Sequence, residues 1–82
     1  MGYHKAVIEK GLLGDLSKIQ EELDELQDAE VQGARILMLC EVADLMGAVE
    51  AYLEKNLPGF TLQDCKVMAD LTKSAFKDGS RA

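Results

Sequence analysis

Apolar residues recur along the first third of the chain with the period of an α-helix. From residue 12 they are spaced four, three, four and three positions apart: Leu12, Leu16, Ile19, Leu23 and Leu26. This spacing places the side chains on one stripe of a helix, and such a stripe normally packs against a neighbour. We therefore predict a first helix over residues 3–30, loosened at Gly11 and Gly14, because glycine is unfavourable inside a helix.

The rest of the chain predicts two further helices with a clear stop between them. An apolar stretch over residues 33–55 predicts the second helix, which the turn residues Pro58 and Gly59 end. The sequence TLQD at residues 61–64 has the spacing of a capping box, in which a threonine and an acid cap the start of a helix. The third helix should therefore follow it and end near Lys77.

Helices with short connections favour antiparallel neighbours, so the expected fold is all-α, an antiparallel helical bundle of about three helices per chain. Residues 1–82 should form one domain, since 82 residues are too few for a second core. The second helix has an apolar stripe at Met38, Val42, Leu45 and Val49. It is also apolar at Leu37 and Ala48, which lie on another face. We therefore expect oligomerisation, as a homodimer or homotetramer, to complete the bundle.

Charge and composition exclude several classes of function. Residues 1–54 hold twelve acids against four bases, whereas residues 55–82 hold five bases against three acids. An acidic body argues against binding duplex nucleic acid, which needs a basic surface. No apolar stretch is long enough to span a bilayer, so no membrane role is expected. Two cysteines and no leader sequence favour a reduced, cytoplasmic protein, with Cys40 and Cys65 as packing residues.

Two pairs of acids occupy matching positions on the first two predicted helices. Glu22 and Glu25 lie to one side of the first apolar stripe, and Glu41 and Asp44 lie at about the same angles beside the second. Each pair is spaced three residues apart, so its side chains emerge one turn apart on one face. In antiparallel helices the four carboxylates can converge, and crowded anions stay ionised only beside cations. Oxygen ligands favour hard ions, Mg²⁺ first and Mn²⁺ second.

Two structural interpretations compete with a metal site. The acid run at residues 21–26 fits a solvated helix face when it is taken alone. Salt bridges to Lys18 or Arg35 would neutralise the second acid pair without a metal. A di-iron site is less suitable, because it needs Glu-x-x-His on two helices, and His4 lies outside such a spacing. The metal site is favoured because the two pairs have the same phase.

Written as a pattern, the acids form Glu-Glu-x-x-Glu, then fifteen residues, then Glu-x-x-Asp. This pattern resembles the signature of the MazG-like, all-α nucleotide pyrophosphohydrolases, in the short form found in bacteria and their phages. The similarity extends from GDLSKIQEELDEL through CEVADLMGAVEAYLEK to TKSAFKDGSR. It implies an all-α NTP pyrophosphatase-like fold. It also implies that the protein acts in the cytoplasm of a bacterium or of a phage-infected host.

The resemblance also implies an activity and the residues that perform it. It implies a Mg²⁺-dependent enzyme that cleaves a noncanonical or deoxynucleoside triphosphate between the α- and β-phosphates, giving the monophosphate and pyrophosphate. By position, Glu22, Glu25, Glu41 and Asp44 match the metal ligands. Glu21 matches an additional acid that orients or deprotonates the attacking water.

The substrate phosphates would also need cations from the protein. Lys18 lies one turn before Glu22 on the same face, and a second basic group comprises Lys73, Lys77 and Arg81. Lysines at helix ends are also common without a ligand, since they interact favourably with the helix dipole. Two related activities remain open, on phosphoribosyl-ATP and on guanosine tetraphosphate-type alarmones. A rival from another class is a structural helical oligomerisation module, in which the acids are solvated or salt-bridged.

Overall fold

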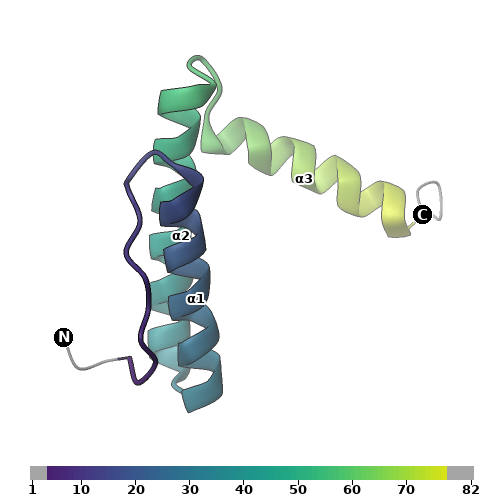
Figure 1. Cartoon of the computed structure of the whole chain (residues 1–82). Helices are drawn as coiled ribbons and strands as arrows, with labels where there is room; N and C mark the ends of the chain where they lie inside the picture. The colour runs from purple at the N-terminus through teal and green to yellow at the C-terminus, as the bar shows by residue number, and fades with distance from the viewer. Residues whose placement is uncertain (1–3, 78–82) are drawn as a thin grey trace.

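A computed structural model describes residues 4–77, with side chains described for residues 4–74. Figure 1 shows an all-helical chain, and the described residues contain no strand. The prediction of an all-α fold with three helices is therefore confirmed. The helices are α1 (Leu16–Gln32), α2 (Arg35–Asn56) and α3 (Leu62–Lys77). Within the described range no helix is long and apolar enough to cross a bilayer.

The first helix is shorter than the prediction of residues 3–30. Residues 4–15 are not helical and form an extended segment that runs back along the helices (Figure 1). Gly14 has a φ of 97°, outside the helical region, and the Asp15 N–H donates to the Leu12 carbonyl at 3.0 Å to close a turn. A Cβ at Gly11 would lie 2.2 Å from a backbone oxygen of α1. The two glycines therefore lie before the helix, which begins at Leu16, and do not loosen its interior.

The α1 and α2 helices form an antiparallel hairpin (Figure 1). Gly33 ends α1 in the left-handed conformation, with a φ of 70°, and Ala34 completes a two-residue connection. Glycine reaches this conformation without steric cost, which explains the sharp end of the helix. The buried apolar residues are Ala29, Ala48 and Leu53. Two of these three are alanines, so the hairpin has close contacts between helices but a very small hydrophobic core.

The face that α1 turns toward α2 carries acids as well as these small residues. Four charged side chains are buried among residues 4–74: Glu21, Glu22, Asp28 and Glu41. The predicted packing stripe lies outside, since Leu12, Leu16 and Leu23 are 69%, 64% and 47% exposed. Ile19 and Leu26 of the same stripe are half-buried, so packing of the stripe against a neighbour is met only in part within one chain and otherwise stays a prediction. Glu22 lies beside the acids of α2, whereas Glu21 and Asp28 accept backbone N–H groups of the extended segment. Much of the apolar stripe is exposed.

The start of α3 agrees with the sequence pattern. The Thr61 N–H donates to Asp64 Oδ2 at 2.9 Å, and the Asp64 N–H donates to Thr61 Oγ1 at 3.2 Å. Each side chain thus satisfies a backbone donor that the helix itself cannot reach. The predicted capping box is confirmed, and the described part of the helix runs to Lys77, so its end near that residue stays a prediction.

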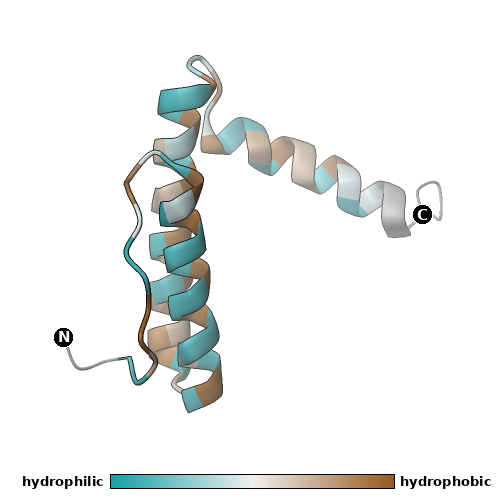
Figure 2. Cartoon of the chain, in the orientation of Figure 1, coloured by the Kyte–Doolittle hydropathy of each residue, from teal (hydrophilic) through white to brown (hydrophobic). Residues whose placement is uncertain are grey.

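The third helix does not close a bundle within one chain. It contacts α2 but not α1 among the described residues, and it projects away from the hairpin (Figure 1). Figure 2 shows hydrophobic residues recurring along it. The radius of gyration is 14.9 Å, whereas a compact chain of this length has about 12 Å. A bundle built by one chain alone is therefore excluded, and its completion by a second subunit stays a prediction.

The two cysteines differ in their surroundings. Cys40 on α2 is exposed, whereas Cys65 on α3 is half-buried, and both are free thiols. The expectation that Cys40 packs is therefore not met within one chain. It lies on the side of α2 that α1 does not cover, next to Leu39, which is also exposed.

Candidate metal centre

The acids of the two motif halves meet between α1 and α2, where they form what we call the acid cluster: Glu21, Glu22, Glu25, Glu41 and Asp44. One oxygen each from Glu22, Glu41 and Asp44 lies within 4.8 Å of the other two. The carboxylates of Glu21, Glu22 and Glu25 form a second group of the same size. The antiparallel hairpin therefore brings all five predicted acids together from two helices.

Two oxygens of the acid cluster have no hydrogen-bond partner among the described residues. They are Glu22 Oε1 and Glu41 Oε1, on side chains whose residues are 5% and 4% exposed. A buried carboxylate oxygen without a partner is costly, because it has lost water and gained nothing in return. Carboxylate oxygens are also the donors that Mg²⁺ and Mn²⁺ prefer. The donor set and the two unpaired oxygens therefore fit a divalent cation.

Glu21 makes contacts that tie the extended segment to α1. Its Oε1 accepts the Gly11 N–H at 2.8 Å and the Lys18 ammonium at 3.2 Å, and Lys10 Nζ lies 3.6 Å from its Oε2. The Gly11 hydrogen bond foremost, with Lys18, lowers the pKa of Glu21 to about 2 although burial opposes the shift. A carboxylate with this pKa is a weak base. The predicted role of Glu21 toward the attacking water stays a prediction.

Lys18 neutralises the acid cluster in this structure. Its Nζ lies 3.0 Å from Glu22 Oε2, in addition to its bond with Glu21. The hydrogen bond to Glu22 is the main reason that the pKa of Lys18 is raised. Lys18 thus pairs with acids of the first motif half and not, as the structural interpretation predicted, with Glu41 or Asp44. Arg35 has no ion pair in the part of the chain that the structure describes. Contact of Lys18 with substrate phosphates stays a prediction.

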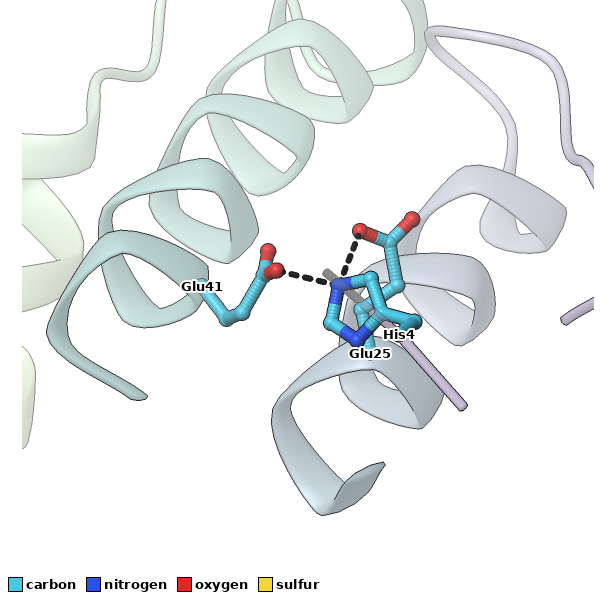
Figure 3. A group of neighbouring side chains, drawn as sticks. All are labelled: His4, Glu25 and Glu41. Carbon is cyan, nitrogen blue, oxygen red and sulfur yellow. Dashed lines mark hydrogen bonds and ion pairs between the residues drawn. The ribbon is translucent and has the colours of Figure 1, made fainter. Parts of the chain in front are cut away.

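His4, which the sequence analysis set aside, lies inside the site. Its Nε2 is 2.6 Å from Glu41 Oε2 and 3.3 Å from Glu25 Oε2, and its Nδ1 is 2.9 Å from Asp28 Oδ2. Figure 3 shows the ring between the two glutamates. Burial favours the neutral ring, but hydrogen bonds to Asp28 and Glu41 outweigh it and raise the pKa of His4. The extended segment therefore places an imidazole against three carboxylates, which favour its protonated form.

Asp28 fixes the other side of the imidazole, and it too was missed from the sequence. Its carboxylate accepts the backbone N–H groups of Lys5 at 3.1 Å and Ala6 at 3.3 Å, and the Gln32 side-chain amide at 2.8 Å. The bond to His4 foremost lowers the pKa of Asp28, and these three donors add to the effect. Asp28 lies one turn after Glu25 on α1, a spacing that could have extended the predicted acid face.

The pKa of Glu25 is raised by its surroundings. Burial foremost, then the charges of Glu22 and Glu41, raise the pKa of Glu25 to about 7, although His4 opposes the shift. A carboxylate with this pKa is partly protonated near neutral pH. Crowding of the acids thus adds to the effect of burial at Glu25.

Of the predicted basic group at the end of the chain, only the side chain of Lys73 is described, and no contact joins it to the acid cluster. Lys73 is exposed on α3, where its charge acts on Asp70. The side chain of Lys77 and all of Arg81 lie outside the described residues. The binding of phosphates by these three residues stays a prediction.

The chain was also compared with family models, with curated proteins and with solved structures. None of the three comparisons gives a match for this chain. The fold and the site together define a class, an all-α chain with an acid cluster between two antiparallel helices.

Proposed function

We propose that this protein is a Mg²⁺-dependent nucleotide pyrophosphohydrolase of the MazG-like type, which cleaves a nucleoside or deoxynucleoside triphosphate to the monophosphate and pyrophosphate. The observation that carries the proposal is the group formed by Glu22, Glu41 and Asp44, because it joins the two halves of the motif in one place. The unpaired oxygens of Glu22 and Glu41 support it further, since they are buried donors in need of a cation.

Each part of the site has a task in this proposal. Glu22, Glu41 and Asp44 would hold Mg²⁺, with Glu25 beside them. Mg²⁺, when bound, supplies a Lewis acid that polarises phosphate oxygens and lowers the pKa of water. An open cavity of about 400 Å³ borders Glu25, Glu41 and Asp44, and Lys10 lines it. A phosphate chain in this cavity would lie next to the acids, with the Lys10 ammonium as its first protein cation.

The proposal is tested with a panel of nucleotides and the purified chain. The panel contains the common ribo- and deoxyribonucleoside triphosphates, noncanonical triphosphates, phosphoribosyl-ATP and guanosine tetraphosphate. We expect monophosphate and pyrophosphate in equal amounts from at least one triphosphate with Mg²⁺, and none with EDTA. Release of orthophosphate, or no turnover of any compound, would contradict the proposal. Activity confined to either of the last two compounds would move the assignment to the related activities.

A structural helical oligomerisation module is the second candidate, and one observation favours it. Lys18 and His4 already pair with the acids, so the cluster is partly neutralised without any metal. In such a module the buried ion pairs would fix the register of α1 against α2. A folded, oligomeric protein that neither hydrolyses the panel nor binds Mg²⁺ would support this candidate.

Both candidates share a prediction about assembly, because apolar side chains are exposed along all three helices. The exposed set on α2 and α3 includes Ile36, Leu39, Met46, Val67, Met68 and Leu71. Burial of such surface is the main driving force for association, so we expect light scattering at micromolar concentration to give a dimer or tetramer of the 9.0 kDa chain. Leu71→Glu should lower the measured mass, whereas Lys73→Glu, at an exposed charged position, should not. A stable wild-type monomer would contradict this prediction.

A further inference from the structure

The imidazole of His4 faces carboxylates with both of its nitrogens. Nδ1 is 2.9 Å from Asp28, and Nε2 is 2.6 Å from Glu41 and 3.3 Å from Glu25. A neutral imidazole has one N–H and one lone pair, and a lone pair that faces carboxylate oxygens at these distances is repelled. The place between Nε2 and the two glutamates therefore calls for a positive centre, which is either a proton or a metal ion.

The hydrogen bonds around the His4 ring resemble those of a histidine that binds a metal ion. Metal-binding histidines commonly donate their second ring N–H to a carboxylate, which sets the tautomer and the orientation of the ring. Asp28 is placed for this role at Nδ1, and the backbone N–H groups of Lys5 and Ala6 hold it in turn. This arrangement leaves Nε2 directed at Glu25 and Glu41 (Figure 3).

A second observation points to a ligand at the same place. The Glu41 side chain is almost fully buried, and its Oε1 has no partner among the described residues even though its Oε2 contacts His4. One ligand atom each from His4, Glu25 and Glu41 lies within 4.8 Å of the other two. Three donors from three segments of the chain thus converge, and one of them has an oxygen left over.

We propose that His4 Nε2, Glu25 and Glu41 form a second metal site, which binds a borderline divalent transition ion such as Co²⁺ or Zn²⁺ in preference to Mg²⁺. Imidazole nitrogen suits these ions, whereas Mg²⁺ binds oxygen donors. The site shares Glu41 with the all-oxygen group of Glu22 and Asp44. It does not depend on the proposed hydrolysis, because it concerns only the binding of an ion.

The test uses the fact that the chain has a single histidine. In NMR spectra of the untagged protein, one equivalent of Co²⁺ should shift the His4 ring signals strongly, and one equivalent of Zn²⁺ should move them to a new position. In calorimetry, His4→Gln should weaken Co²⁺ binding at least 10-fold and change Mg²⁺ affinity less than twofold. Glu9→Gln, an exposed position on the same segment, is the matched control and should match wild type for both ions.

Two outcomes would overturn the proposal. Ring signals unchanged by stoichiometric Co²⁺ would show that a proton alone occupies the place beside Nε2; this measurement needs only the wild-type chain, so it holds even if His4→Gln fails to fold. Full His4 shifts in both Glu25→Gln and Glu41→Gln would show that the ion binds to the extended segment without the cluster. Loss of the shifts in these two variants, with helix content retained by circular dichroism, supports the site.

Discussion

Glu41→Gln is expected to reduce Mg²⁺-dependent pyrophosphate release by about 10²- to 10³-fold, with its helix content unchanged. Glu41 is buried and belongs both to the group with Glu22 and Asp44 and to the group with His4. The amide cannot carry the negative charge that holds a divalent cation. Asp44→Asn should give a similar loss, since it removes another charge from the same group.

The measurement is single-turnover release of pyrophosphate from the preferred nucleotide, with circular dichroism as the check on folding. Glu50→Gln is the matched control, because Glu50 is an exposed acid on the same helix. It should retain wild-type rates. Turnover at the wild-type rate by either Glu41→Gln or Asp44→Asn would remove the acid cluster from the proposed chemistry.

The metal-free protein should lose stability as the pH rises from about 4.5 to above 7. The folded pKa of Glu25 is about 7 and its ordinary value is 4.5, so the folded chain binds more protons than the unfolded chain between them. The stabilisation is complete below the lower value and is lost as the pH passes the upper one. The difference corresponds to about 3 kcal/mol in the free energy of unfolding.

Two neighbours affect the same pH profile in different ranges. The raised pKa of His4 acts in the same direction, since its stabilisation is present below 6.5 and is lost as the pH rises past the folded value. Glu21, with its pKa lowered to about 2, acts in the opposite direction but only between about 2 and 4.5. The loss of stability between pH 5 and 8 therefore reports Glu25 and His4.

Melting curves between pH 5 and 8, with EDTA and with Mg²⁺, measure this effect. Mg²⁺ should restore stability at high pH, because a ligand bound only by the folded state stabilises it. Glu25→Gln should melt higher than wild type at pH 8 in EDTA and gain less from Mg²⁺. It disturbs His4 less than Glu41→Gln does, because Nε2 of His4 lies 3.3 Å from Glu25 but 2.6 Å from Glu41. A wild type whose stability changes with neither pH nor Mg²⁺ would contradict the electrostatic account of the cluster.

The features that could be predicted from sequence depend on neighbours close in the chain. The Thr61 capping box and the end of α2 before Pro58 follow from such local rules. So does the convergence of the two acid pairs, because helical spacing fixes the face that each pair occupies and the hairpin needs only two connecting residues. The acid cluster was therefore accessible from the sequence.

The features that were missed depend on contacts distant in the chain. Residues 4–15 have no periodic pattern, and His4 reaches Glu41 across 37 positions. The choice of inward face on α1 is another case. Periodicity shows that the helix has an apolar and an acidic face, but in one chain the acidic one meets α2. An apolar stripe predicts that the helix packs against a neighbour, but it does not indicate whether that neighbour belongs to the same chain.

The two-residue connection at Gly33 and Ala34 also sets an order of folding events. Contacts between α1 and α2 can form first beside this turn and then at positions progressively farther along both helices. Closing so short a loop costs little conformational entropy. His4 has no such route, since Asp28 lies on α1 and Glu41 on α2. We therefore expect His4 to contact both partners only after the two helices have met, although it leaves the ribosome before either helix.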